Sequence, residues 1–253
     1  MLTFTEADVL AWVTPILWPF LRILALFSAV PVIAQRGVPI RVRIGLAFLV
    51  AFCAQASIPP IAPIALESSA ALLAVLQQVL VGVSLGFAVR IVISAVEFAG
   101  ELVGLQMGMN FAAFFSPMSG GEQTAVSRFY GIAIAWLFIV TGGHLLVIAA
   151  VVQSFTAFPV ASDPFEFLRV VEPQHWGAEI FRLGLWIALP LVAMLLFTNL
   201  VLGVISRVAQ QMNVFAIGFP ITLGVGLVGV MLTLPLMEMP FTMALERMLA
   251  QFQ

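Results

Sequence analysis

The chain has 253 residues, of which 62% are hydrophobic and 9% are charged, and its mean hydropathy is +1.16. A soluble domain carries about a quarter of charged residues, so this composition argues strongly against a water-soluble protein. The net charge of -2, with arginine as the one basic residue type, provides no basic surface for nucleic acid. The single cysteine, Cys53, lies in an apolar run and excludes a disulfide framework. We therefore expect an all-α integral membrane protein without a separate soluble domain.

Six apolar runs approach the roughly 20 residues that cross a hydrocarbon core as a helix. In chain order they cover 10–34, 44–58, 70–89, 129–155, 181–205 and 214–236. The second run is short for a span. The first is interrupted by Pro15, Pro19, Arg22 and Pro31, and a proline inside a helix removes a backbone hydrogen bond and kinks or breaks the element. We therefore expect the first run to be broken, both runs to be poor spans, and 156–180 to form an acidic connection.

The segment between Arg90 and Arg128 is too polar and glycine-rich for an ordinary membrane helix, yet too apolar for a loop in water. Five methionine and phenylalanine residues lie within nine positions of the sequence before Pro117: Met107, Met109, Phe111, Phe114 and Phe115. Methionine is flexible and adapts to different shapes, so such a group could seal a pore and still yield to a passing chain. The segment therefore predicts a gate or plug, with an ordinary packed hairpin corner as the alternative.

A charged stripe precedes this group. On a helix, Glu97 and Glu101 lie within about 20° of Arg90, because they follow it by seven and eleven residues. Unpaired charges are costly in an apolar environment, so we expect the stripe to face other subunits, with a helix end that extends its charges toward water as the alternative. Small residues that let helices approach closely recur beside it at Gly100, Gly104 and Gly108.

Enzyme chemistry finds little support in the sequence. Gly82, Ser84 and Gly86 match the Gly-x-Ser-x-Gly elbow by letter, but that motif needs a turn from a strand to a helix. His144 has no carboxylate positioned in the sequence to orient it as a base. His144, His175 and the cysteine do not give metal-ligand spacing, and no phosphate-binding loop with lysine is present. We therefore predict no enzyme activity, no cofactor and no metal.

The stretch LGVISRVAQQMNVFAIGFP at 202–220 closely resembles the signature of the FliR family of flagellar export proteins, which is akin to the SctT components of virulence type III secretion systems. Further matches follow the order of the family at 38–43, 97–101, 106–108 and 142–155. Two positions depart from its pattern. Gln210 stands where the family often has proline, and Ser116 stands where it often has aspartate.

The resemblance implies a FliP-like part fused to a FliQ-like part, built from membrane-derived helical hairpins. Taken as a single export-gate domain over 1–253, the chain would hold the FliP-like part at about 1–205, including a plug loop at 106–122. The FliQ-like part would cover about 206–253 together with the preceding helix.

The resemblance also implies partners and a location. FliR-like proteins are single-copy members of a helical hetero-oligomer with FliP and FliQ subunits, and they work with FlhB-like and FlhA-like export components. The FliPQR-type complex would pass unfolded flagellar proteins. It would belong to the flagellar basal body in the bacterial inner membrane, with its assembled core projecting to the periplasmic side.

Carried onto this chain, the resemblance implies that the plug is the 107–117 region, with Phe111, Phe114 and Phe115 as obstructing side chains. It makes a second group of residues candidates for pairing with other subunits: Arg90, Glu97, Glu101 and Arg207. The predicted function is that of a structural and gating subunit of the flagellar type III export gate. The alternatives are a self-contained secondary transporter or channel, in which the charged stripe would line the path, and an intramembrane enzyme that depends on Ser84.

Overall fold

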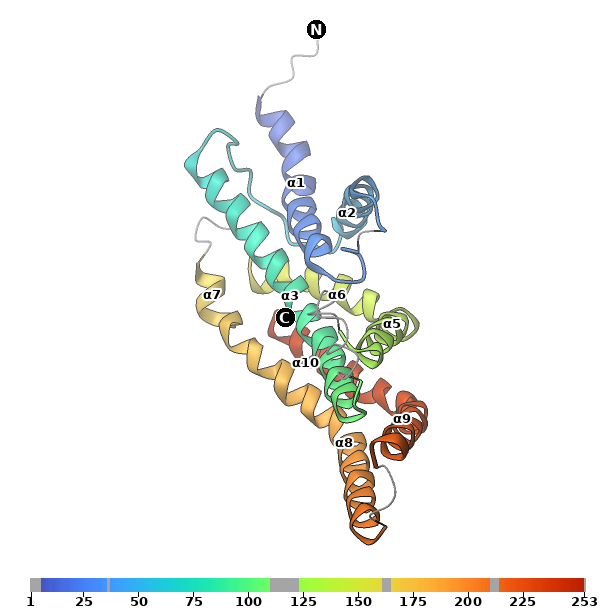
Figure 1. The fold of residues 1–253 in the computed structure, drawn as a ribbon. Helices are drawn as coiled ribbons and strands as arrows, with labels where there is room; N and C mark the ends of the chain where they lie inside the picture. Colours follow the sequence, from blue (N-terminus) through green and yellow to red (C-terminus); the bar gives the residue numbers. More distant parts are fainter. Residues whose placement is uncertain (1–5, 36, 110–122, 161–164, 210–213, 253) are drawn as a thin grey trace. The chain divides into compact units, whose positions relative to one another are not determined.

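A computed structural model describes residues 6–35, 37–109, 123–160, 165–209 and 214–252. Within these ranges the chain is helical and contains no strand, so the all-α prediction is confirmed (Figure 1). The chain divides into two compact units. Unit 1 comprises Met1–Ile91, Gly142–Trp176 and Ala244–Gln253, and unit 2 comprises Val92–Thr141 and Gly177–Met243.

Unit 1 contains α1 (Glu6–Ala29), α2 (Ile40–Ala54), the first part of α3 (Ser69–Gln106), α6 (Gly143–Ala157) and α7 (Glu166–Val171). The 3-10 helices η2 (Pro173–Trp176) and η4 (Ala250–Phe252) and the end of α10 (Glu238–Leu249) complete it. Aromatic packing attaches the C-terminal residues to the rest of unit 1. The ring of Phe252 lies 5.7 Å from the rings of both Phe167 and Trp176.

The expected break in the first apolar run is wrong at Pro15 and Pro19, through which α1 continues, but it is confirmed at Pro31, because α1 ends at Ala29. Close packing on α3 supports the helix. A Cβ added to Gly82 of α3 would lie 2.8 Å from Cβ of Ala25 on α1. Because Gly82 has no side chain, α1 can pack closely on α3, and this packing offsets the backbone hydrogen bonds that the prolines remove.

Unit 2 contains the rest of α3 from Val92, α5 (Ala125–Val140), α8 (Gly177–Val208), α9 (Val214–Thr233), η3 (Leu234–Met237) and the first residues of α10. Glycines again mark the closest helix approaches. A Cβ on Gly184 of α8 would lie 2.7 Å from the backbone oxygen of Ala95 on α3. A Cβ on Gly229 of α9 would lie 2.5 Å from Cε of Met194 on α8.

Three element boundaries differ from the apolar runs. α3 does not end near Val89 but continues to Gln106, so the first half of the central segment is helical. The fourth run is divided at Gly142, which adopts a left-handed φ of 74° and separates α5 from α6. The acidic connection contains α7 and η2.

Among the described residues, four helical stretches are long and apolar enough to cross a membrane, or five if α5 and α6 count together as one span. The four stretches are Trp12–Ala29, Ser69–Gln106, Phe167–Val208 and Ala216–Phe252. By length and composition the first of them qualifies as a span, so the expectation that the proline-containing run is a poor span stays a prediction. With 15 residues, α2 remains too short, as the sequence predicts.

Candidate functional site

The candidate site is the base of the central loop, where α3 ends and α5 begins in unit 2. Gly108 follows α3 with a left-handed φ of 80°, its N–H donates to O of Leu105 at 3.0 Å, and the N–H of Met109 donates to O of Gly104 at 3.1 Å. This pair of bonds is a Schellman motif, in which glycine is favoured because it adopts a positive φ without strain. Gly108 therefore caps the helix end, and its predicted role in helix packing stays a prediction.

The predicted plug begins at Met107, at this cap, and its phenylalanines follow in the sequence. Phe111, Phe114 and Phe115 fall outside the described residues, so their predicted role as obstructing side chains stays a prediction.

The other end of the loop is fixed by Thr124, the N-cap of α5, whose hydroxyl accepts a hydrogen bond from N–H of Ser127 at 3.2 Å. Glu101, one turn before the end of α3, holds this cap in place. Its Oε2 accepts hydrogen bonds from the N–H of Thr124 at 2.9 Å and from the Thr124 hydroxyl at 3.0 Å. A carboxylate is favoured there because the N-terminus of a helix carries partial positive charge and unpaired N–H groups. Glu101 therefore ties the start of α5 to the end of α3.

Close contact between the two helices surrounds this clamp. A Cβ on Gly100 would lie 2.8 Å from Cα of Ser127, and a Cβ on Gly104 would lie 2.7 Å from Cβ of Thr124. The Ser127 hydroxyl donates to the backbone oxygen of Glu97 at 2.8 Å. Larger residues at the two glycines would push α5 away from α3 and lengthen the bonds to Glu101.

Met107, the last residue before the cap, is fully buried in this structure. It lies against α9, where a Cβ on Gly226 would come within 2.6 Å of its Sδ atom. The missing side chain of Gly226 therefore creates the space that Met107 fills. Met109 is half-buried. The prediction that both methionines seal a pore is not tested by this arrangement.

The charged stripe lies on α3, as its spacing predicts, but its two carboxylates are directed at α5 of the same chain. Glu101 contacts Thr124, and Oε1 of Glu97 would lie 3.0 Å from a Cβ on Gly131. Arg90 is exposed, and Arg207 is exposed near the end of α8. The contacts predicted between these four charged residues and other subunits stay predictions.

A buried arginine in unit 1 is the polar feature that sequence reasoning missed. Arg22 of α1 is fully buried, and its guanidinium donates three hydrogen bonds to neutral acceptors. The acceptors are Oε1 of Gln78 at 2.7 Å, Oγ of Ser154 at 2.9 Å and the backbone oxygen of Phe158 at 2.8 Å. The ring of Phe155 lies beneath the guanidinium, with its centroid 3.7 Å from the central carbon. Arg22 thus connects α1, α3 and α6.

Further hydrogen bonds extend this network. Nε2 of Gln78 donates to Oε1 of Gln77 at 3.0 Å, and Nε2 of Gln77 donates to the backbone oxygen of Pro159 at 3.0 Å. The sequence carried one usable signal. An arginine in the middle of an apolar run needs partners, and the adjacent glutamines in another apolar run are suitable acceptors.

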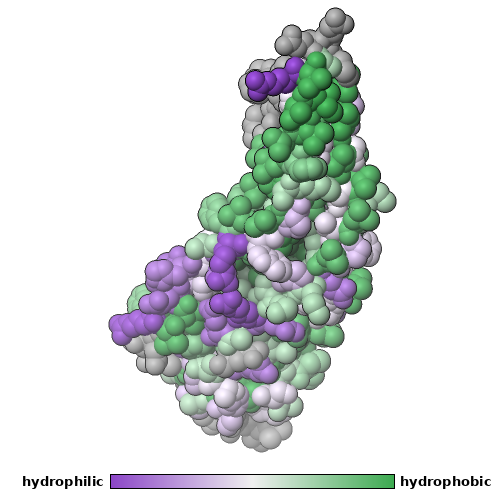
Figure 2. All heavy atoms as spheres, turned by 90° about the horizontal axis from the view of Figure 1, so that it is seen from below, coloured by the Kyte–Doolittle hydropathy of each residue, from purple (hydrophilic) through white to green (hydrophobic). Residues whose placement is uncertain are grey.

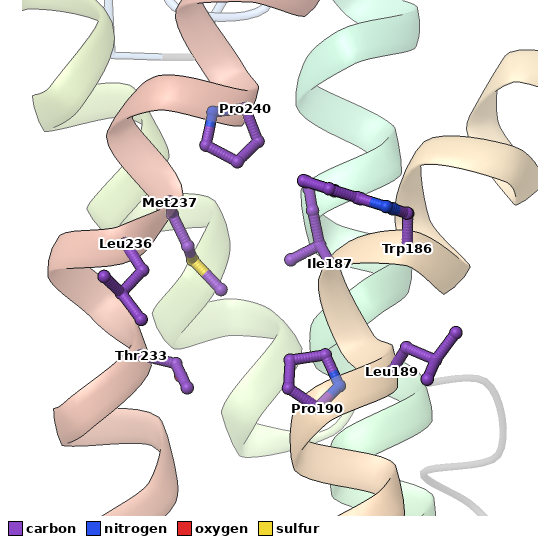
Figure 3. Close-up of a pocket in the computed structure, with 8 residues that line it drawn as sticks. All are labelled: Trp186, Ile187, Leu189, Pro190, Thr233, Leu236, Met237 and Pro240. Carbon is purple, nitrogen blue, oxygen red and sulfur yellow. The ribbon is translucent and has the colours of Figure 1, made fainter.

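Unit 2 also holds a cavity of about 380 Å³ between α8 and the segment from the end of α9 to α10 (Figure 3). Its lining residues are Trp186, Ile187, Leu189, Pro190, Thr233, Leu236, Met237 and Pro240. The hydroxyl of Thr233 donates to the backbone oxygen of its own helix at Gly229, 2.9 Å away. The cavity therefore suits an apolar group and offers no set of polar side chains for a soluble substrate.

The residues considered for enzyme chemistry do not form a recognisable catalytic arrangement in the described chain. Ser84 lies inside α3, within a continuous helix and not at a turn from a strand to a helix. His144 lies in the first turn of α6. Among the described residues, no three His, Cys, Asp or Glu side chains are grouped so that they could hold a metal ion.

Comparison with known proteins identifies relatives along most of the chain. The family model described as bacterial export proteins, family 1, matches residues 13–248. The Flagellar biosynthetic protein FliR of Pectobacterium carotovorum subsp. carotovorum is 41% identical over 241 residues, which cover 95% of this chain and 92% of the relative. The protein of the same name from Escherichia coli (strain K12) is 39% identical and covers 90% and 87%. That from Bacillus subtilis (strain 168) is 31% identical and covers 83% and 82%.

Proposed function

This chain belongs to the bacterial export proteins, family 1, and on that premise we propose that it is a structural and gating subunit of the flagellar protein export gate. The observation that carries the proposal is its similarity, over most of both chains, to relatives named Flagellar biosynthetic protein FliR. The chain is thus a component of the flagellar export apparatus. In it, the chain would join FliP-like and FliQ-like subunits and FlhB-like and FlhA-like components around a conduit for unfolded flagellar proteins.

The exposed apolar surface supports an assembly of several subunits in or at a membrane. Hydrophobic side chains cover large areas of one face of the molecule (Figure 2). In the described chain, α8 has no buried residue after Leu195, although apolar side chains follow, such as Phe197 and Leu200, which are 66% and 65% exposed. Surfaces of this kind need other helices or lipid as cover. We infer a FliP-like part fused to a FliQ-like part, located in the bacterial inner membrane within the flagellar basal body.

The frame at the base of the central loop supports a gating role. A plug has to be held at a defined place to close a conduit, and both ends of the 110–122 segment are attached to folded elements of one unit. Met107 is seated against α9, and Thr124 is clamped by Glu101. We therefore infer that the segment between them is presented to the conduit, where its phenylalanines would obstruct the passage of ions.

The test is the conductance of the assembled complex. We expect a variant with Phe111→Ala, Phe114→Ala and Phe115→Ala to co-purify normally with the FliP-like and FliQ-like subunits. In planar bilayers its complex should conduct ions more strongly than the wild type. Phe165→Ala, which removes an exposed phenylalanine at the start of α7, is the control and should leave the conductance unchanged. Wild-type conductance in an assembled triple variant would reject the plug, while failure of the wild-type chain to co-purify with the other subunits would reject the export-gate assignment.

The alternative of a self-contained transporter is less well supported by the geometry. A charged path for a substrate or proton would need Glu97 and Glu101 to face a conduit within the chain. Glu101 instead accepts two hydrogen bonds at the start of α5. Purification distinguishes the two functions, because a transporter binds its small substrate as a monomer or homo-oligomer, whereas a gate subunit co-purifies with different chains.

A further inference from the structure

The helix α2 is mostly apolar, and it packs on its own chain mainly through small residues, with the ring of Phe48 6.4 Å from that of Phe20. Ala47, Ala51 and Ala54 are the buried residues of α2, which lies beside α1 (Figure 1). The opposite side, called here the outer face, is formed by residues within about 60° of Gly45 on the helix. Its members are Arg41, Val42, Gly45, Phe48, Leu49 and Phe52. The four apolar side chains among them are 48–59% exposed.

Gly45 forms a notch at the centre of the outer face. A Cβ added at this position would meet nothing within 4 Å, so the packing of the chain itself does not require glycine there. Glycine in the middle of a helix is destabilising relative to alanine. A close approach by a helix from outside the chain would explain why a bare position is useful there.

Lipid is a poor candidate for the cover of this face. With 15 residues, α2 is about 22 Å long and cannot cross a hydrocarbon core of about 30 Å. The outer face also carries Arg41, which is exposed one turn before Gly45. An arginine facing acyl chains is unfavourable, and lipid gains nothing from a glycine notch. Both features favour a protein helix as the occupant.

A second copy of this chain is a poor candidate as well. The helix α2 contains Arg41 and Arg43 but no acidic residue, so contact between two α2 helices supplies no carboxylate for either arginine. The guanidinium of Arg43 is already turned toward its own chain, donating to the backbone oxygens of Gln35 at 2.8 Å and Val38 at 3.2 Å. Arg41 has no ion-pair partner among the described residues. A partner with an acidic side chain at this level would satisfy it.

We propose that the outer face of α2 is a docking surface for an apolar helix of a different export-gate subunit, which crosses α2 at Gly45 and presents a carboxylate to Arg41. The inference rests on the proposed function and extends it by locating one contact through which the chain enters the assembly. Interface helices with small residues at the crossing point and one polar pair are favoured where the hydrophobic effect between helices is weak.

The test co-expresses the full chain with the FliP-like and FliQ-like subunits and measures how much of each co-purifies. Gly45→Leu should reduce recovery of the complex at least tenfold, because its side chain would fill the notch at a position where an added Cβ meets no atom of its own chain within 4 Å. Gly45→Ala should reduce it less, and Arg41→Glu should reduce it because two carboxylates would then face each other. Gly177→Leu adds the same side chain at another position with nothing within 4 Å and should assemble normally.

The single cysteine provides an independent readout. Cys53 is exposed near the edge of the outer face. In a complex whose other subunits lack cysteine, we expect its reaction with maleimide to be at least tenfold slower than after denaturation in SDS. For Gly45→Leu chains that remain in the membrane, this protection should be lost.

Each outcome decides between the inferences. If Gly45→Leu and Arg41→Glu assemble like the wild type, the docking surface is refuted and lipid is the cover, while the proposed function stands. If differently tagged copies of this chain co-purify through α2 without the other subunits, a second copy is the occupant and the proposal is again wrong. If the wild-type chain forms no complex, the proposed function itself fails. If the Gly45→Leu chain is degraded, the recovery of the complex with Gly45→Ala and Arg41→Glu tests the docking surface instead.

Discussion

The clamp between Glu101 and Thr124 gives the sharpest quantitative prediction. Glu101→Gln keeps the shape of the side chain and one acceptor oxygen, but it removes the charge that faces the start of α5. Two hydrogen bonds, at 2.9 and 3.0 Å, change from charge-assisted to neutral. We expect unit 2 to be destabilised without loss of the overall fold.

The magnitude follows from the contacts. Charge-assisted hydrogen bonds are roughly twice as strong as neutral ones, which suggests a loss of about 1 kcal/mol for a half-exposed glutamate. Loss of an anion from the N-terminus of a helix adds about 0.3–1 kcal/mol. Glu101→Gln should therefore cost about 1–2 kcal/mol. Glu101→Ala should cost about 3 kcal/mol, because it also leaves the N–H of Thr124, a residue 7% exposed, without its acceptor.

The assay is thermal unfolding of the purified complex, followed by tryptophan fluorescence, with a double-mutant cycle over Glu101→Ala and Thr124→Ala. For a chain of this size, 1 kcal/mol corresponds to a shift in Tm of about 2–4 °C. The coupling between the two substitutions should be at least about 1 kcal/mol. Glu172→Gln is the control, since its exposed side chain, 3.8 Å from His175, contributes little to stability. Additive effects of the two substitutions would refute the clamp.

Further substitutions test other parts of the structure. Gly100→Ala should lower Tm by several degrees because its Cβ would lie 2.8 Å from Cα of Ser127, whereas Gly203→Ala, with nothing within 4 Å, should leave Tm unchanged or raise it slightly. Gly108→Ala should cost about 1 kcal/mol in thermal unfolding, because its φ of 80° disfavours a Cβ. Arg22→Lys should lower the amount of folded chain in membranes severalfold, since one ammonium group cannot replace three hydrogen bonds that leave a guanidinium in different directions. Ser84→Ala should leave flagellar export and motility unchanged, and loss of export with normal chain abundance would revive the enzyme interpretation.

Much of the fold could be predicted because it follows from hydropathy and helix length. The apolar runs predict the class and most helix positions, and the short second run agrees with the 15 residues of α2, which fall short of a span. The breaks expected at Pro15 and Pro19 are wrong because a proline removes one hydrogen bond locally, whereas α1 packs on Gly82 of α3 over several turns. The apolar run itself does not indicate this packing. The helix α3 continues past the end of its apolar run because the charged residues that follow do not interrupt it. Arg90 is exposed, and Glu101 is hydrogen-bonded to the start of α5.

The sequence predicts which residues belong to the candidate site, but it does not predict what they contact. The spacing of Glu97 and Glu101 places both carboxylates on one helix face, but it does not indicate which element that face meets. The answer depends on α5 returning along α3, which brings Thr124 to Glu101 across 23 positions of sequence. Arg22 was missed for a different reason, since its acceptors are neutral amide, hydroxyl and carbonyl groups. Such partners leave no charge pattern in the sequence.

The two polar networks clarify how an apolar chain specifies one arrangement of its helices. Apolar side chains pack almost equally well in many registers, so hydrophobic contacts alone define the positions of neighbouring helices poorly. Hydrogen bonds at Arg22 and at Glu101 are directional, and an incorrect register would leave those buried or half-buried groups without partners. Each network lies within one compact unit and joins helices that are distant in the sequence. The register within each unit is therefore set inside the chain, whereas outer surfaces such as that of α2 remain available to other subunits. A substitution in a polar network should then reduce the abundance of the chain itself, whereas one on an outer face should reduce assembly while leaving the chain folded.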